Sequence, residues 1–228
     1  MTQDPNVAIV ELVVAALGPL ADELVLVGGC AVGLLITDRA RPPVRQTIDV
    51  DLLTEVAPTA NYYAFCERLR VQGFREQSTE QVICRWAKGN LLIDVMPTDG
   101  TVIGFTNSWY AEAAASAKLC TLPNGGQIRL LSAPLFVATK LEAFRARGQG
   151  DYLHHDMEDI VNLIDGRSTI VEEVGEASKQ VRDFLADEFD ALLSDPAFLE
   201  LMSWHLAPQE QQRRKDIVLE RMRKIFGL

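Results

Sequence analysis

A glycine pair and two closely spaced aspartates are the residues of this chain whose types and spacing best suit chemistry on phosphate. Gly28-Gly29 follows the short apolar run Leu24–Val27, and Asp49-Val50-Asp51 lies in the alternating run Thr47–Leu53. In a strand, side chains at i and i+2 share a face, so these carboxylates would stand about 7 Å apart. Burying them unpaired is costly, and a divalent cation such as Mg²⁺ offsets that cost. Glycines before a helix allow close approach of the backbone to a triphosphate.

Asp94 is a third candidate carboxylate, in the otherwise apolar run Leu91–Val95. If this run forms a strand beside Thr47–Leu53, three carboxylates converge on one site. Such a set could bind two metal ions, which would align an attacking oxygen with a departing pyrophosphate. The alternative is that Asp94 is paired with a neighbouring arginine.

Charged residues elsewhere each have a catalytic and a structural interpretation. Lys140 lies on an apolar helix face, where its ammonium could neutralise a triphosphate or extend into solvent along its stem. Arg45 could contact a triphosphate or an acceptor, or be a solvated loop charge. Asp156 could shape the site or be an acid favoured by a helix N-terminus. His154-His155 could suggest a metal site, but adjacent helical side chains point in different directions, so we interpret them as loop or helix-start residues.

The elements that must position these residues form an α/β half followed by an all-α half. We expect residues 1–132 to form the α/β domain and residues 133–228 the helical domain. The α/β elements expected are a helix capped by Asp4, strands Leu24–Val27 and Thr47–Leu53, helices Cys30–Thr37 and Pro58–Gln72, a hairpin of Gln81–Ala87 with Leu91–Val95, and a hairpin around Asn124–Gly126. The later helices expected are Leu135–Arg147, His155–Ile164, Thr169–Phe189, Pro196–Leu206 and Pro208–Phe226.

These motifs resemble known enzymes over roughly residues 24–165. Val27–Ala31, Arg45–Leu52 and Asp94 together resemble the DNA polymerase beta-like nucleotidyltransferase superfamily. Ser132–Arg145 and His155–Ile160 look similar to the AbiEii-type, toxin-like nucleotidyltransferases. The resemblance implies a mixed β-sheet domain of the nucleotidyltransferase fold followed by an α-helical C-terminal domain.

The resemblance also implies a role for each matching residue. Gly28 and Gly29 would bind the nucleoside triphosphate, Asp49 and Asp51 would bind metal, Asp94 would complete the metal site or act as base, Lys140 would contact phosphate, and Asp156 would help to shape the site. Cys30 departs from the pattern, because many relatives have Ser or Thr there and a thiol is a weak donor.

The reaction expected is Mg²⁺-dependent transfer of a nucleoside monophosphate from an NTP to an acceptor hydroxyl, with two metal ions. By resemblance the acceptor is tRNA, another RNA or a protein side chain, and a cognate antitoxin accompanies a toxic enzyme. One alternative is a transferase for a small molecule such as an aminoglycoside antibiotic. Another is a catalytically silent nucleotide-binding module, against which the intact pair Asp49 and Asp51 argues.

Composition narrows the class of partner. The chain has 228 residues and a net charge of −10, which argues against non-specific coating of nucleic acid. The segment 213–224 is nevertheless basic, and it could pack across the acidic helices before it or offer a strip to RNA. The sequence shows no Cys-x-x-Cys pair, no signal-peptide pattern and no apolar run judged long enough to span a membrane. We therefore expect a cytoplasmic protein without a membrane partner.

Overall fold

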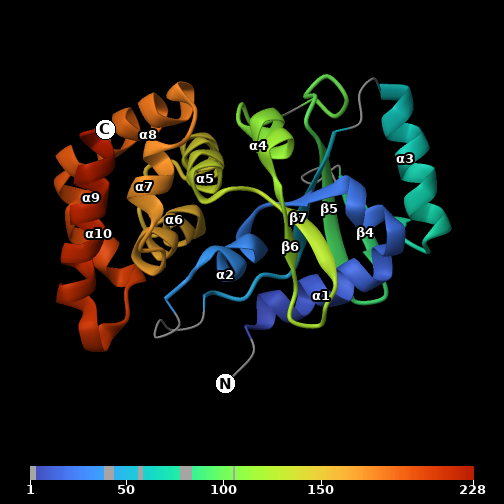
Figure 1. Cartoon of the computed structure of the whole chain (residues 1–228), viewed down its shortest axis with the longest axis horizontal. Coiled ribbons are helices and arrows are strands. Elements are labelled where there is room, and N and C mark those ends of the chain that lie inside the picture. The colour runs from blue at the N-terminus through green and yellow to red at the C-terminus, as the bar shows by residue number, and fades with distance from the viewer. Residues whose placement is uncertain (1–3, 39–43, 56–58, 78–83, 105) are drawn as a thin grey trace. The chain divides into compact units, whose positions relative to one another are not determined.

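The computed structural model describes residues 4–38, 44–55, 59–77, 84–104 and 106–228 (Figure 1). The chain divides into two compact units. One consists of Met1–Leu34 and Arg45–Ser132, and the other of Leu35–Val44 and Ala133–Leu228. The segment 35–44 thus belongs with the helices, although it precedes the aspartate motif in the sequence.

The first unit is built on a mixed sheet, and the described residues contribute seven strands in the order β3-β4-β5-β2-β1-β7-β6. The strands are β1 (Leu24–Leu26), β2 (Val50–Thr54), β3 (Arg75–Glu76), β4 (Arg85–Lys88), β5 (Leu91–Pro97), β6 (Lys118–Thr121) and β7 (Gln127–Leu130). Strand β2 runs parallel to β5 and antiparallel to β1, and β1 runs parallel to β7. This mixed sheet, followed by helices, confirms the predicted fold class.

The helices of the first unit are α1 (Pro5–Leu17), α2 (Val32–Leu35), α3 (Thr59–Val71) and α4 (Tyr110–Ser116). Helix α1 begins as predicted, because the Asp4 side chain accepts a hydrogen bond from the backbone N–H of Asn6. Its residues Val10, Val13 and Leu17 are fully buried, and the helix packs on β2 and β5.

The segment Pro5–Glu23 is long and apolar enough to cross a membrane by length and composition alone. The prediction that no apolar run is long enough to span a membrane is therefore wrong for this segment. Part of this apolar surface is used inside the protein, since 44% of its most apolar window is buried. That burial is typical of a core helix, because an apolar stripe is what packs a helix onto a sheet.

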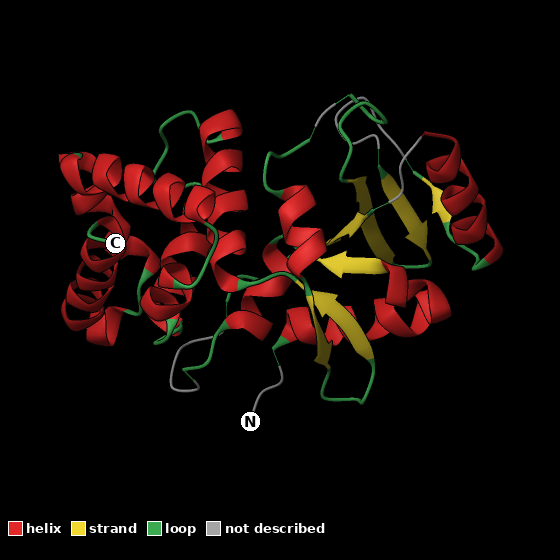
Figure 2. Cartoon of the chain, turned by 45° about the horizontal axis from the view of Figure 1, so that its top comes forward, coloured by secondary structure: helices red, strands yellow, loops and turns green. Residues whose placement is uncertain are grey.

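The described residues of the second unit form helices joined by loops, with no strand among them (Figure 2). Its helices are α5 (Ala133–Arg147), α6 (His155–Gly166), α7 (Ile170–Gly175), α8 (Lys179–Ser194), α9 (Pro196–Leu201) and α10 (Gln211–Phe226). The prediction of one helix over Thr169–Phe189 is wrong. Helix α7 ends at Gly175, and a new helix starts where the Ser178 hydroxyl accepts a hydrogen bond from the N–H of Val181.

The basic helix α10 packs against α6 and α8. Arg214 is buried and pairs with Asp165 at 2.9 Å, while Arg221 donates to the carbonyls of Ile164 and Asp165 at the end of α6. A cation at a helix C-terminus is favoured by the helix dipole. The structure therefore favours the packing interpretation of this basic segment over the RNA strip.

Two expectations in the first unit need correction. The predicted helix Cys30–Thr37 is only a short 3-10 turn, Gly29–Ala31, followed by the four residues of α2. The predicted strand Thr47–Leu53 begins instead at Val50, so Asp49 lies in the bend before it. Strand β3 and helix α4 were not predicted. Residues 81–83 of the first predicted hairpin lie outside the described residues, as do Arg39 and Arg41, which precede Arg45 in the sequence.

Candidate active site

Strand pairing brings Asp51 and Asp94 together. In the parallel pair β2·β5, Asp51 stands directly beside Asp94. Residues in register on neighbouring strands project their side chains to the same face of the sheet. Asp94 is buried and Asp51 is half-buried, so both carboxylates are partly removed from solvent. Asp51 and Asp94 are therefore close enough in the sheet to contribute to one site.

Asp49 is positioned by hydrogen bonds of the preceding bend, because no strand pairing reaches it. The fully buried side chain of Asn6 donates to the carbonyl of Arg45 at 2.8 Å and accepts from the N–H of Thr47 at 2.9 Å. The Thr47 hydroxyl contacts the Cys30 thiol at 2.8 Å and donates to the carbonyl of Asp49 at 3.2 Å. These bonds attach the bend to α1 and to the glycine turn.

Arg85, a residue that no sequence motif had singled out, is a cation of this cluster. Its Nε and Nη2 atoms donate to the two oxygens of Asp94, each at 2.8 Å. Nη2 also donates to Oδ2 of Asp49. Hydrogen bonding to Asp94 is the main cause that raises the pKa of Arg85 above its ordinary value, so the guanidinium stays charged. The alternative interpretation, in which Asp94 is paired with a neighbouring arginine, is therefore confirmed, and the role of Asp94 as metal ligand or base stays a prediction.

Gly28 sits against Asp51 in a backbone conformation that only glycine adopts readily. Its φ of 65° and ψ of −165° fall in the region closed to side chains. A Cβ on Gly28 would lie 1.8 Å from Oδ2 and 2.6 Å from Cβ of Asp51. The glycine therefore permits the close approach of turn and carboxylate. Gly29 follows in the buried 3-10 turn, too short to supply the helix dipole that the sequence suggested.

Two buried thiols lie near the carboxylates, and the negative charge of the carboxylates raises the pKa of each thiol. Burial is the main cause that raises the pKa of Cys30 to about 12, and the charges of Asp51 and Asp49 raise it further. Burial likewise raises the pKa of Cys84 to about 12, with contributions from the charges of Asp94 and Asp51. Both thiols are therefore protonated at neutral pH. The oxygens of the aspartates are the donors suited to a hard cation such as Mg²⁺.

Lys140 and Asp156 belong to the helical unit, where they pair with each other. Lys140 is buried, and its Nζ lies 3.0 Å from Oδ1 of Asp156 and 2.7 Å from Oδ2 of Asp159. Arg147 makes two further bonds to Asp156, each at 2.8 Å. The interpretation of Lys140 as an exposed lysine is wrong. Its contact with phosphate stays a prediction, as does the role of Arg45, an exposed residue of the bend.

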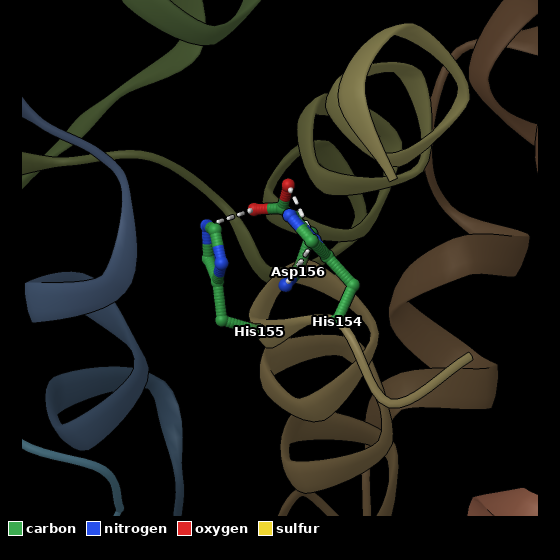
Figure 3. Close-up of side chains that lie close together, drawn as sticks. All are labelled: His154, His155 and Asp156. Carbon is green, nitrogen blue, oxygen red and sulfur yellow. Dashed lines mark hydrogen bonds and ion pairs between the residues drawn. The ribbon is translucent and has the colours of Figure 1, made fainter. Parts of the chain in front are cut away.

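His154, His155 and Asp156 place three possible metal-ligating atoms within 4.8 Å of one another (Figure 3). His154 is the N-cap of α6, where its Nδ1 accepts a hydrogen bond from the N–H of Asp156. This confirms its interpretation as a helix-start residue. A metal ion here would face the positive charges of Lys140 and Arg147 on the same carboxylate, and like charges repel. We therefore do not assign this cluster to a metal.

Three solved structures are similar to this chain over most of its length. They are an antigenic nucleotidyltransferase-like protein from Paracoccidioides brasiliensis (18% identity, TM-score 0.53, covering 89% of this chain and 94% of that one), the antibiotic-resistance factor ANT(2'')-Ia (17%, 0.50, 89% and 100%), and a nucleotidyltransferase candidate from H. pylori (11%, 0.52, 99% and 96%). Comparisons with protein-family models and with curated sequences give no match. At these identities the likeness defines the fold, which is that of nucleotidyltransferase-like proteins.

Proposed function

We propose that this chain is a nucleotidyltransferase that transfers a nucleoside monophosphate from an NTP to an acceptor hydroxyl. The observation that carries the proposal is the contact between the Gly28 turn and Asp51, with Asp94 in register beside it and Asp49 in the bend just before the same strand. A backbone free of side chains beside paired carboxylates suits a triphosphate with its cation. The fold supports the same class of enzyme.

The residues of the first unit have distinct parts in the proposed reaction. Asp49 and Asp51 would hold Mg²⁺, which when bound neutralises phosphate charge and polarises the phosphorus under attack. The turn at Gly28 leaves room for phosphate oxygens beside Asp51. The acceptor oxygen bonds to the α-phosphorus, the bond from that phosphorus to the β-bridging oxygen breaks, and pyrophosphate leaves. The acceptor proton passes to a carboxylate of the cluster.

For the acceptor we propose an RNA, with tRNA first, or a protein hydroxyl, as in the AbiEii-type enzymes that the sequence resembles. A toxin role and a cognate antitoxin belong to the same proposal. A small cationic acceptor is the second candidate, because the net charge of −10 suits one and because a structurally similar protein is an antibiotic-resistance factor.

The direct test is label transfer from each of the four α-³²P-labelled NTPs in the presence of Mg²⁺. The acceptors are total RNA, the protein itself and a set of aminoglycosides. We expect label in RNA or protein, and we expect Asp51→Asn to lower the rate by at least about 100-fold, since it removes a proposed metal ligand. Asp22→Asn, at an exposed position of the same unit, is the matched control.

Each outcome has a defined meaning. Label in an aminoglycoside would replace the RNA or protein acceptor by the second candidate. Full activity in Asp51→Asn would overturn the site assignment. Absence of any labelled product would overturn the proposed function, and binding of an NTP without any labelled product would leave a catalytically silent nucleotide-binding module.

A further inference from the structure

We infer that Arg85 is a resident cation of the carboxylate cluster and takes the place of one of the two metal ions expected there. The protein then holds one divalent ion, through Asp49 and Asp51, while Asp94 is committed to Arg85. The inference rests on the proposed function, and it replaces the two metal ions expected from the sequence with one metal ion and one guanidinium.

The backbone places Arg85 at this position. Strands β4 and β5 are antiparallel, and Arg85 is the direct cross-strand partner of Asp94. Side chains of such partners start about 5 Å apart on the same face of the sheet. The pairing of β4 with β5 continues through Trp86, Ala87 and Lys88 to the turn, so it is held by the whole hairpin. The guanidinium therefore stays beside Asp94 as long as the sheet is intact.

The side-chain geometry completes the assignment. Arg85 uses two nitrogens on the two oxygens of Asp94, which is the bidentate arrangement that favours arginine over lysine. One of the same nitrogens contacts a single oxygen of Asp49. The side chains of Arg85 and Asp94 are only 23% and 10% exposed, so water screens this pair less than it would a surface pair.

The balance of charge favours one ion. Three carboxylates carry a charge of −3, and Arg85 reduces it to −2, which one divalent ion neutralises. A second divalent ion on Asp94 would lie against the guanidinium, and repulsion at such short range outweighs the gain from a carboxylate that is already paired. Arg85 occupies both oxygens of Asp94 but only one oxygen of Asp49. The proposal therefore assigns the metal ion to the second oxygen of Asp49 together with Asp51.

The experiment counts Mn²⁺ bound per chain, by the electron paramagnetic resonance signal of free Mn²⁺ and by calorimetry, with no nucleotide present. Asp51→Asn gives the background from sites outside the cluster. We expect the wild type to hold one ion at the cluster. We expect Arg85→Met to hold a second ion, or to hold one at least about tenfold more tightly, because Asp94 is released.

Two further variants make the result specific to Asp94. The double variant Arg85→Met with Asp94→Asn should lose the second Mn²⁺ ion, or the tighter Mn²⁺ binding, that Arg85→Met gains. Arg75→Met, which removes an exposed arginine from β3 of the same sheet, should bind as the wild type does. Circular dichroism checks that each variant is folded. If Arg85→Met does not fold, Arg85→Lys keeps a cation at the cluster and should still hold one ion.

Two ions at the cluster in the wild type or in Arg85→Lys would overturn the inference. Unchanged or weaker binding in a folded Arg85→Met, or no binding in either protein, would overturn it too. Because no nucleotide is used, this count is independent of label transfer. A one-ion count without any labelled product would refute the proposed function alone, and a two-ion count with labelled product would refute this inference alone.

Discussion

At the residue scale, the position of Asp49 depends on the amide of Asn6. The amide donates to the carbonyl of Arg45 and accepts from the N–H of Thr47, two groups on either side of Gln46. Buried backbone groups need partners, and the bend before β2 has no strand pairing to supply them. The Asn6 side chain on α1 therefore supplies the backbone hydrogen bonds that a neighbouring strand would supply within the sheet.

We predict that Asn6→Ala destabilises the protein by about 1–3 kcal/mol, because it leaves the buried N–H of Thr47 without its partner. For a chain of this size each kcal/mol lowers Tm by about 2–4 °C. Urea and thermal unfolding measure the change. Asn90→Ala, at an exposed position of the β4–β5 turn, is the matched control and should stay within about 0.5 kcal/mol of the wild type. Equal stabilities of the two variants would show that the Asn6 amide does not hold the bend.

At the scale of elements, the short turn after β1 shapes the candidate site, because it brings the backbone at Gly28 against Asp51. The turn at Gly28 lets the chain pass against Asp51, while the N–H of Val27 donates to the carbonyl of Asp51 at 3.0 Å. The two strands and the turn thus form one rigid corner. The short 3-10 turn that follows leaves the glycine backbone, and not a helix dipole, as the feature available to phosphate.

We predict that Gly28→Ala costs about 1–3 kcal/mol of stability, because alanine is strained in this backbone conformation. The larger effect should fall on the site, since the new Cβ collides with the Asp51 carboxylate. Mn²⁺ binding and label transfer should both be lost.

Gly89→Ala is the control for this prediction. Gly89 also has a positive φ, 59°, but nothing lies within 4 Å of a Cβ there. That variant should lose stability and keep Mn²⁺ binding. Normal Mn²⁺ binding by a folded Gly28→Ala would show that the close contact with Asp51 does not matter to the site.

The hairpin β4–β5 is the second element that shapes the candidate site, because it places Arg85 beside Asp94. Its turn consists of Gly89 and Asn90, which makes Lys88 and Leu91 the first pair and Arg85 and Asp94 a later one. In a two-residue hairpin the turn fixes the register of every pair beyond it. The neighbour of Asp94 could therefore have been identified from the sequence by counting back from the turn.

At the scale of the whole molecule, each unit contains its own cluster of buried charge. The first has Asp49, Asp94 and Arg85, and the helical unit has Lys140 and Asp156 with their partners. Burial raises the pKa of Asp156, but the hydrogen bonds and charges of Arg147 and Lys140 outweigh it and hold that pKa below its ordinary value. The helical unit is therefore stabilised by an ionised carboxylate.

This direction of the shift predicts an acid-sensitive unit. A carboxylate with a lowered pKa contributes stability that is complete above the unfolded value of about 3.9 and is lost as the pH falls below it. We predict that Asp156→Asn costs about 3–5 kcal/mol at pH 6, since it breaks a buried ion pair, and that its deficit shrinks below about pH 4. Urea unfolding followed by circular dichroism at pH 6 and pH 3.5 measures both.

Asp183→Asn provides the control on α8, because Asp183 forms an exposed pair with Lys179 and should matter by no more than about 0.5 kcal/mol. A deficit in Asp156→Asn that is equal at the two pH values would contradict the assigned role of the Asp156 carboxylate.

The sequence by itself determined the order of elements and the types of residue available for chemistry. Strand periodicity marked Asp49 and Asp51, and an otherwise apolar run marked Asp94. The cap at Asp4, the turn at Gly28 and the hairpin turns follow from short-range backbone chemistry. These features depend on neighbours a few residues away, so they leave a local pattern.

Only the tertiary structure decided which side chains and strands contact the candidate residues and position them. The parallel register of β2 and β5, the bonds from Asn6 to residues about 40 positions later, and the pairing of Lys140 with Asp156 join segments distant in the chain. Such contacts form because buried polar groups must find partners wherever the fold brings them, and nothing in the local sequence names the partner.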